Sequence, residues 1–502
     1  MEHSTSFLTK LKNTKTVQTL TRFSRSTLFI GLLALGSLLA YALAIELVYY
    51  TLVVICGLFV FLLGDDFLPI IPMFLFCYIA PASSNNPGKH ADSIFYISNG
   101  AWYMFILIAL VIPAVIFRLA TDKEIGRSKL IFTKRKLWLG LVVLGVSYLL
   151  SGIGVEHYGE VWSNNLLFAF LQFVCVIGLY FLFSATIKWN KSHIDYFAWV
   201  MLFFGLTVSA EVIYRYLFTN LYSDDGVFLR GLIYTGWGNY NNVGEMIATA
   251  IPFGFYFACK EKRSYIYLGL SAIMLAGLVL SCSRGSTLVG AVIFACCFVV
   301  SLFLCKHKKE YCISSICYSV LAVILAICLR DQIVGLFNSI PDIVNTDNGG
   351  FNDAGRLDIY KKGLGIFLDN PIFGQSFYQS PNVDPKDFWW QYADLSLWKS
   401  FMPAWCHNSI VQMLASCCAV GMLSYSFHRL QTIKLFYKKL TLLNVFIGLS
   451  LVCFLTMSLL DCHFFNLGPT LIYSLMLCVA ENHPDEEVLP LFKRRKKQKL
   501  EE

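Results

Sequence analysis

Long apolar stretches alternate with short polar segments along almost the whole chain. A helix that crosses a bilayer needs about 20 predominantly apolar residues, and the chain contains about fourteen stretches of nearly that length. Because no water reaches the bilayer core, each stretch is expected to satisfy its own backbone hydrogen bonds as a helix. The predicted spans cover residues 26–45, 48–64, 67–81, 100–119, 137–153, 165–186, 194–218, 240–259, 265–282, 286–304, 312–329, 406–427, 441–459 and 466–480.

One polar stretch is much longer than the others and runs from residue 330 to residue 405. A connection of that length inside a compact protein is usually functional. The pattern therefore predicts an all-α polytopic membrane protein, a helical bundle of about 12–14 transmembrane helices with one large helical extracytoplasmic loop. We divide the chain into a cytoplasmic N-terminal segment (1–25), the first part of the bundle (26–329), the loop (330–405), the last part of the bundle (406–480) and a basic cytoplasmic tail (481–502).

Two segments of the large loop are expected to be helical. Apolar residues recur at helical spacing from Leu357 to Phe367, and Asp353 before them is a candidate N-cap. This helix should end near the sequence DNPIFG, since proline and glycine interrupt helices. The second segment, residues 387–401, is rich in tryptophan, which is typical of a helix in the outer membrane interface.

Composition and charge agree with a membrane protein and fix its predicted orientation. The chain is 57% hydrophobic and only 14% charged, whereas a soluble domain is about 25% charged. With a cytoplasmic N-terminus, every basic segment falls on the cytoplasmic side, as the positive-inside rule requires, and both termini are cytoplasmic. These segments should contact anionic lipid and not nucleic acid. They are KLKNTK (10–15), RSKLIFTKRK (127–136), KWNKSH (188–193), CKEKR (259–263), CKHKKE (305–310), HRLQTIKLFYKK (428–439) and KRRKKQK (493–499).

The sequence lacks several motifs of well-known cytoplasmic enzymes. It has no HExxH, no paired CxxC, no phosphate-binding P-loop and no DxD-like motif. An enzyme that uses ATP or a nucleotide-sugar is therefore disfavoured. The 17 cysteines show neither metal nor disulfide spacing, so we interpret them as reduced packing residues.

Four charged or titratable residues are predicted to gather on the outer side of the membrane. Arg230, Arg284 and Arg356 lie there although arginine is scarce at outer membrane edges, and His407 opens the span after the large loop. Arginine makes bidentate contacts with phosphate oxygens, and histidine takes up a proton near neutral pH. Together they indicate a polyanion site with one titratable base.

Each of these residues has a plainer alternative. Arg284 can extend toward lipid phosphate from a helix end, and Arg230 can anchor a loop. Arg356 can lie on the solvated face of its helix, and His407 can be a helix-capping or interface residue. The functional interpretation depends on all four residues occurring on one side of one membrane.

Other charged residues carry weaker signals. Glu211 and Arg215 are four residues apart in one predicted span and can pair on one helix face. Such a pair is most simply structural, although intramembrane charges also mark substrate paths. Asp461 and His463 in the last outer loop are a rival source of the base. His157, between two glutamates, is interpreted as part of a hydrated loop and not as a metal ligand.

Four segments occur in a fixed order between about residues 225 and 425. They are RGLIYTGWGNYNNVGEMIATAIPF (230–253), SRGSTLVGAVIF (283–294), GRLDIYKKGLGIFLDNPIFGQSF (355–377) and HNSIVQMLASCCAVGML (407–423). In order, spacing and topology they resemble the O-antigen ligase and O-antigen polymerase (Wzy-type) superfamily of bacterial membrane glycosyltransferases. One departure is GNYNN, where many members have Pro-Asn, so the roles of Asn241 and Asn242 stay open.

The resemblance implies a reaction at the outer face of the cytoplasmic (inner) membrane. A glycan is transferred from undecaprenyl pyrophosphate to an acceptor hydroxyl on a glycan or glycolipid, without a metal or other cofactor. It implies that Arg230, Arg284 and, less firmly, Arg356 hold the donor phosphates while His407 is the base. Membrane lipid and other membrane proteins of polysaccharide assembly are the further partners that it implies.

Within the superfamily the sequence favours an O-antigen ligase slightly, because the Ser-Arg-Gly and His-Asn segments are well formed. A polymerase of O-antigen, capsule or exopolysaccharide, which joins lipid-linked repeats, is the close alternative. A transporter of lipid-linked glycans is a more distant one. It predicts charges along a path through both leaflets and often inverted repeats, neither of which the sequence shows.

Overall fold

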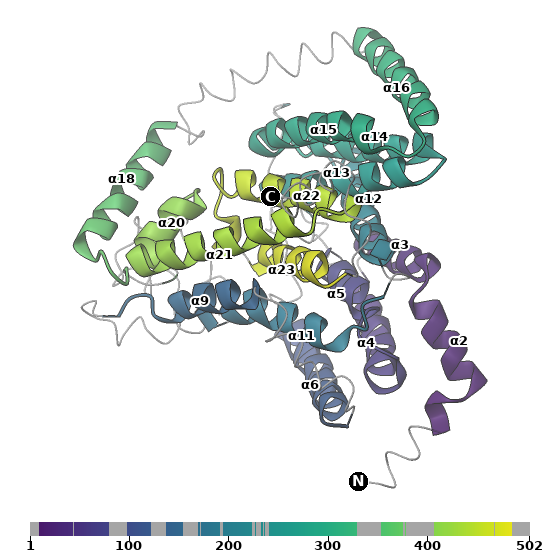
Figure 1. Cartoon of the computed structure of the whole chain (residues 1–502), viewed down its shortest axis with the longest axis horizontal. Coiled ribbons are helices and arrows are strands. Elements are labelled where there is room, and N and C mark those ends of the chain that lie inside the picture. The colour runs from purple at the N-terminus through teal and green to yellow at the C-terminus, as the bar shows by residue number, and fades with distance from the viewer. Residues whose placement is uncertain are drawn as a thin grey trace, which may run out of the picture.

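The computed structural model of the chain describes residues 10–43, 45–79, 98–121, 137–153, 169–170, 172–190, 194–222, 226, 232–233, 235, 240–328, 353–374, 377, 406–465 and 467–483. All regular elements in these ranges are helices (Figure 1). The predicted all-α polytopic architecture is therefore confirmed.

The helices of the first part of the chain follow the predicted spans closely. An amphipathic helix, α2, precedes them and meets α3 at an angle of 67°. A single π-helical turn, η1, leads directly into α11. The elements are α2 (Lys15–Ser24), α3 (Thr27–Leu43), α4 (Glu46–Leu63), α5 (Ile70–Ile79), α6 (Ser98–Thr121), α9 (Leu137–Leu149), η1 (Val174–Gly178), α11 (Leu179–Thr186) and α12 (Ile194–Phe218).

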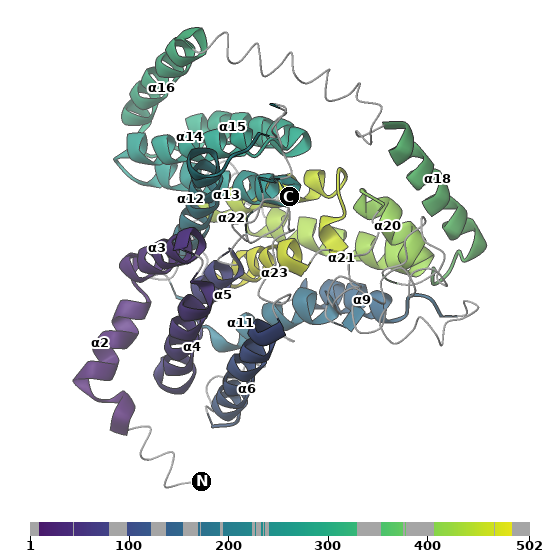
Figure 2. The same ribbon diagram turned by 180° about the vertical axis from the view of Figure 1, so that it is seen from behind.

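The second part of the chain holds the central helices and the helix of the large loop. Figures 1 and 2 show α18 and α20 at one end of the molecule and α2 at the other. The elements are α13 (Tyr240–Lys260), α14 (Ser264–Leu280), α15 (Arg284–Leu304), α16 (Lys308–Cys328), α18 (Asp353–Asp369), α20 (Ser409–Ser416), α21 (Cys418–Lys438), α22 (Leu442–Met457), the 3-10 turn η4 (His463–Phe465) and α23 (Leu467–Asn482).

Several of these helices are apolar enough to cross a membrane. Among the described residues, three pass on length and composition alone: Glu46–Leu63, Asp195–Phe218 and Arg284–Leu304. A fourth passes if α2 and α3 count as one bent span. On α15, large apolar side chains such as Leu288, Val292 and Phe303 are exposed, as expected for a helix that faces lipid tails. The total number of spans stays a prediction.

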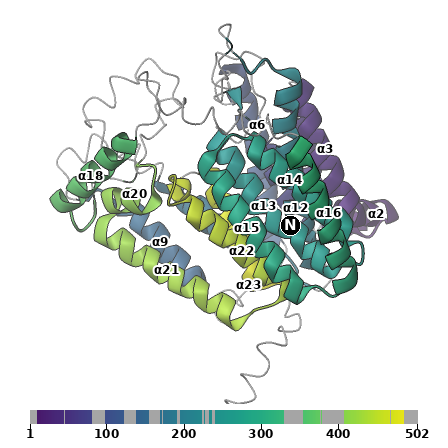
Figure 3. The ribbon, with the colours of Figure 1, turned by 90° about the horizontal axis from the view of Figure 1, so that it is seen from above.

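Helix α13 is the centre of the core. It packs against α12, α14, α15 and α22, and Figure 3 shows it enclosed by these helices. Every residue from Val243 to Cys259 is buried. A helix buried on all sides needs close contacts with several neighbours, and Gly244 supplies one of them. A Cβ at this position would lie only 2.6 Å from Cβ of Ser286 at the start of α15.

Helix α18 is the helix that the structure describes in the large loop. It begins at Asp353, one residue earlier than an Asp353 N-cap would give, and it ends at Asp369, just before DNPIFG as predicted. It packs on α20, where a Cβ at Gly363 would come within 2.8 Å of Val411. The second predicted loop helix, residues 387–401, lies outside the described residues.

The predicted span 406–427 is wrong in two respects. It is divided into α20 and α21 at Cys417 and Cys418, and α21 continues to Lys438, so the basic segment 428–439 is helical almost throughout. The segment that follows α18 stabilises this break. The carbonyl groups of Pro371 and Ile372 accept hydrogen bonds from the backbone N–H groups of Ala419 and Val420, which have no partner within α21 because they lie in its first turn.

Candidate functional site

The Ser-Arg-Gly segment forms the start of α15. Ser283 is the N-cap, and its hydroxyl accepts a hydrogen bond of 3.4 Å from the backbone N–H of Ser286. Arg284 is the first helical residue, and its side chain is exposed. The structure describes no hydrogen bond or ion pair of the Arg284 side chain within its described residues. A free guanidinium beside the positive end of a helix suits a negatively charged ligand.

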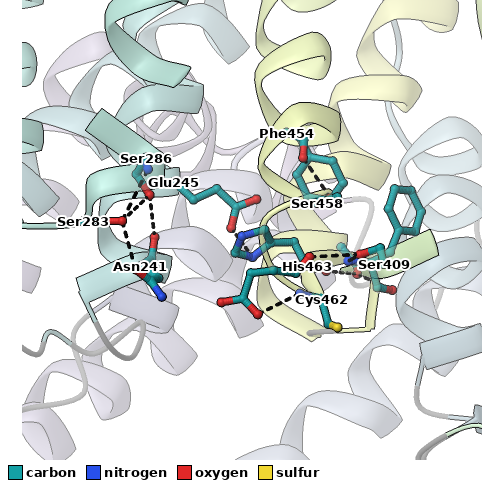
Figure 4. A network of polar contacts seen from close by, with 12 residues as sticks. Asn241, Glu245, Ser283, Ser286, Ser409, Phe454, Ser458, Cys462 and His463 are labelled. Atoms are coloured by element: carbon teal, nitrogen blue, oxygen red, sulfur yellow. Dashed lines mark hydrogen bonds and ion pairs between the residues drawn. The ribbon is translucent and has the colours of Figure 1, made fainter. Parts of the chain in front are cut away.

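Helix α13 holds this segment in place. The Ser283 hydroxyl donates to Oδ1 of Asn241 at 3.0 Å, and the Ser286 hydroxyl donates to the Asn241 carbonyl at 3.2 Å (Figure 4). The close approach of Gly244 to Ser286 brings the two helices together at the same level. Asn241, whose role the sequence left open, thus fixes the segment that carries Arg284.

His407 lies immediately before α20. Asn408 is the N-cap of α20 and accepts hydrogen bonds from the backbone N–H groups of Ile410 and Val411. His407 has a backbone φ of 48°, which is unusual for a residue with a side chain. Its side chain is 35% exposed, so the ring is open to a ligand. The loop helix approaches the same place, because the Tyr360 hydroxyl on α18 donates to the His407 carbonyl at 3.4 Å.

Asp461 lies beside the His407 ring. Its Oδ1 atom is 3.4 Å from Nδ1 of His407, and it also accepts a hydrogen bond of 2.8 Å from the backbone N–H of Cys462. Burial raises the pKa of Asp461, but the hydrogen bond with His407 and the positive charge of His463 outweigh it and lower that pKa to about 2. Asp461 is therefore ionised at neutral pH and can orient and stabilise a protonated His407.

The Asp461 segment bridges the two motifs. Backbone N–H of Ser409 donates to the Ser458 carbonyl at 2.8 Å, which ties the connection between α22 and η4 to the start of α20. On the other side, the same connection touches α15, since a Cβ at Gly285 would lie 3.0 Å from Cδ1 of Leu460. The start of α15, which carries Arg284, and the His407–Asp461 pair are thus joined through one short connection.

A second histidine–carboxylate pair is buried beneath this connection. Nδ1 of His463 lies 2.6 Å from Oε2 of Glu245 on α13, and their side chains are only 2% and 3% exposed. Figure 4 shows the two side chains pointing toward each other, with Asn241 on the same helix as Glu245 and with Ser283 and Ser286 at the start of α15. Sequence reasoning missed Glu245, although an acidic residue in a mainly apolar helix is a usable signal.

Residues 269–426 match the family described as O-antigen ligase. This segment is an O-antigen ligase domain. The resemblance to the O-antigen ligase and polymerase superfamily is thereby confirmed, and the chain is a membrane protein of polysaccharide biosynthesis with a glycosyltransferase-type domain. No curated protein matches the chain.

The O-antigen ligase domain contains three of the predicted site residues, Arg284, Arg356 and His407. The connection between α22 and η4, which contains Leu460, contacts both the segment that carries Arg284 and the segment that carries His407. Arg356 lies in α18, one helical turn before Tyr360. Arg230 precedes the domain and lies outside the described residues, as does His157. The partners Asp461 and Glu245 belong to helices or connections outside the matched segment.

Among the described residues Glu211 and Arg215 make no hydrogen bond or close ion pair with each other, although the positive charge of Arg215 acts on the Glu211 carboxyl. Arg215 donates instead to the Tyr41 hydroxyl at 2.5 Å and to the Thr219 hydroxyl at 3.5 Å. The Glu211 carboxyl is buried and has no hydrogen-bond partner within the described residues. Arg215 therefore takes part in the packing of α12 against α3.

Potential metal ligands do not converge in the part of the chain that the structure describes: no three histidine, cysteine or acidic side chains there lie close enough to share an ion. Every cysteine whose side chain is described is a free thiol. The chemical groups that the site does present are a guanidinium, a partly exposed imidazole and its carboxylate.

Proposed function

We propose that the protein transfers a glycan from undecaprenyl pyrophosphate to an acceptor hydroxyl at the outer face of the cytoplasmic membrane, as an O-antigen ligase does. The observation that carries this proposal is the His407–Asp461 pair, which a single connection links to the start of α15, where Arg284 is exposed. The O-antigen ligase domain, which contains Arg284 and His407, supports the same reaction class.

Arg284 binds the donor through its pyrophosphate in this proposal. Its planar guanidinium matches the phosphate oxygens, and the N-terminus of α15 adds partial positive charge. As the anomeric carbon–oxygen bond breaks, negative charge grows on the departing pyrophosphate, and a fixed cation there lowers the barrier. Arg230 and Arg356 complete the phosphate clamp, as the family resemblance implies.

His407 is the general base. The Asp461 carboxylate accepts a hydrogen bond from the Nδ1–H group, which leaves Nε2 as the acceptor for the proton of the attacking hydroxyl. The acceptor oxygen forms a bond with the anomeric carbon, and the carbon–phosphate oxygen bond breaks with its electron pair on lipid pyrophosphate. The proton passes to Nε2, and the Asp461 carboxylate stabilises the imidazolium. Direct displacement of this kind inverts the anomeric configuration.

The glycosyl–phosphate bond supplies the free energy, so the reaction needs neither ATP nor a nucleotide-sugar. The arginines neutralise the phosphates in place of a metal ion. The proposed orientation keeps both termini in the cytoplasm and the site at the outer face, where lipid-linked glycans and their acceptors meet. Other membrane proteins of polysaccharide assembly are proposed partners.

A transfer assay with purified protein and undecaprenyl-pyrophosphate-linked glycan tests the proposal. We expect His407→Ala to abolish transfer and Arg284→Lys to lower it strongly, because lysine keeps the charge but loses the planar fork. His307→Ala and Arg263→Lys, on the opposite predicted side of the membrane, serve as matched controls. Near-normal transfer by both site variants, with the protein folded, would show that the site is assigned wrongly.

Deletion of the chromosomal copy separates the ligase from the polymerase alternative. A missing ligase leaves long glycan chains on the lipid carrier. A missing polymerase leaves single repeats attached to the acceptor. Analysis of the cell's glycolipids distinguishes the two products directly by length.

A further inference from the structure

The Glu245–His463 pair has the geometry of an ion pair that neither water nor lipid reaches. The 2.6 Å separation joins a carboxylate of the central helix to an imidazole in the turn just after Asp461. A buried charge is strongly unfavourable unless a close partner compensates it. Each member of this pair therefore requires the other, and the pair lies two residues along the chain from the carboxylate that holds His407.

We propose that Glu245 and His463 are positioning residues that set the basicity of His407 through Asp461. This inference rests on the proposed role of His407 as the base. His463 presents positive charge to the Asp461 carboxylate from within the protein, and Glu245 holds that charge in place. The positive charge of His463 therefore partly offsets the negative field that the Asp461 carboxylate exerts on His407.

Electrostatics supports the direction of this effect. Burial lowers the pKa of His463, but the charge of Glu245 and its hydrogen bond raise the pKa further, so the net shift is upward. The positive charge of a protonated His463 is among the causes that lower the pKa of Asp461. The other titratable groups that face this cluster are His407 before α20 and the thiols of Cys406, Cys453 and Cys462.

Hydrogen bonds also hold η4, the turn that contains His463, in place. The Phe464 carbonyl accepts a hydrogen bond of 2.7 Å from the Gln172 side chain, and the His463 carbonyl accepts one of 3.3 Å from the Thr470 hydroxyl. On α13, Glu245 follows Asn241 by four residues, which places both on one helix face. One face of α13 thus holds the Arg284 segment through Asn241 and the His407–Asp461 segment through Glu245.

The pH dependence of His407 tests the proposal. Glu245→Gln cannot hold a cation, so His463 becomes neutral and the Asp461 field at His407 is no longer offset. We expect the acidic limb of kcat/KM to move to higher pH by about half a unit. Glu245→Asp, which keeps the charge, is the matched control and should leave the midpoint close to that of the unaltered protein.

Carbethoxylation of His407 by diethyl pyrocarbonate gives a readout that does not depend on transfer. Only the unprotonated imidazole reacts, so the rate against pH, followed by mass spectrometry of the peptide that contains His407, reports the protonation of that ring. His463→Gln removes the same cation and should produce the same upward shift, and it replaces Glu245→Gln if the latter fails to fold. The double variant should shift no further than either single variant.

The outcomes distinguish this proposal from the proposed function. An unchanged His407 midpoint in Glu245→Gln and His463→Gln, or an equal loss of transfer at every pH, would overturn the positioning role while leaving the base in place. Normal transfer by His407→Ala would overturn the proposed base itself. The carbethoxylation midpoint would still report whether the pair acts on His407.

Discussion

Nδ1 of His407 lies 3.4 Å from Oδ1 of Asp461, although 54 positions separate the two residues in the sequence. This relationship changes how the connection between α22 and η4, which the sequence predicts to be the last outer loop, is interpreted. The sequence offered Asp461 and His463 as a rival source of the base. The structure instead pairs Asp461 with His407 and His463 with Glu245. Two histidine–carboxylate pairs, one partly exposed and one buried, therefore share a single connection.

The first prediction concerns Asp461→Asn. The amide cannot stabilise an imidazolium, so transfer should fall, and the acidic limb of kcat/KM should move to lower pH because no carboxylate favours protonation of the ring. This shift is opposite in sign to that expected for Glu245→Gln. Since the pKa of Asp461 is about 2, this carboxylate stays ionised throughout the assay range and the limb belongs to His407. A pH–rate profile of both variants checks the signs, and shifts in the same direction would contradict the arrangement.

The second prediction concerns Ser283→Ala. This change removes the N-cap of α15 and the hydrogen bond to Asn241, and loss of a cap costs about 1 kcal/mol. Because Arg284 is the next residue, we expect weaker donor binding, seen as a higher KM for the lipid-linked glycan. Thr14→Ala, which removes the cap of α2 at the other end of the molecule, is the matched control. It should affect thermal unfolding in detergent without changing KM.

Sequence reasoning predicted the helices well because hydropathy acts locally on each span. The predicted 286–304 and α15, or 441–459 and α22, differ by only two residues at most. The break at Cys417–Cys418 was missed, because it depends on carbonyl groups from the segment after α18. The continuation of α21 to Lys438 was also missed. The basic residues of segment 428–439 led us to predict that it lies outside a span.

The candidate site was predicted in part. Arg284 and His407 stand in recognisable segments, so their types and neighbours identified them. Their supports could not be found in this way, because Asn241, Glu245 and Asp461 come from other helices and connections. Glu245 in particular is one carboxylate in an otherwise apolar, fully buried stretch of α13. Only the packing of α13 against η4 gives it a partner.

The third prediction concerns Gly374→Ala, a test of how the loop helix is anchored. Gly374 has φ of 73°, and a Cβ there would collide with the Ser416 carbonyl at the end of α20. A side chain in such a conformation costs about 1–3 kcal/mol. We expect lower thermal stability and lower transfer, because the segment after α18, whose carbonyl groups accept hydrogen bonds from the first turn of α21, is displaced. Gly365→Ala is the control, since nothing lies within 4 Å of its Cβ position in α18. There alanine should stabilise the helix by about 0.5–1 kcal/mol.

The last prediction concerns the contact between Gly285 and Leu460. A Cβ at Gly285 lies 3.0 Å from Leu460 Cδ1, so a larger side chain must push the connection that carries Asp461 away from α15. A misplacement of about 1 Å can cost roughly 100-fold in rate, so a shift of a few tenths of an ångström in Gly285→Val should lower kcat by about tenfold. Leu460→Ala creates room and should restore most of this loss in the double variant. If the losses of kcat in the two single variants simply add in the double variant, then Gly285 and Leu460 do not couple the Arg284 segment to the base.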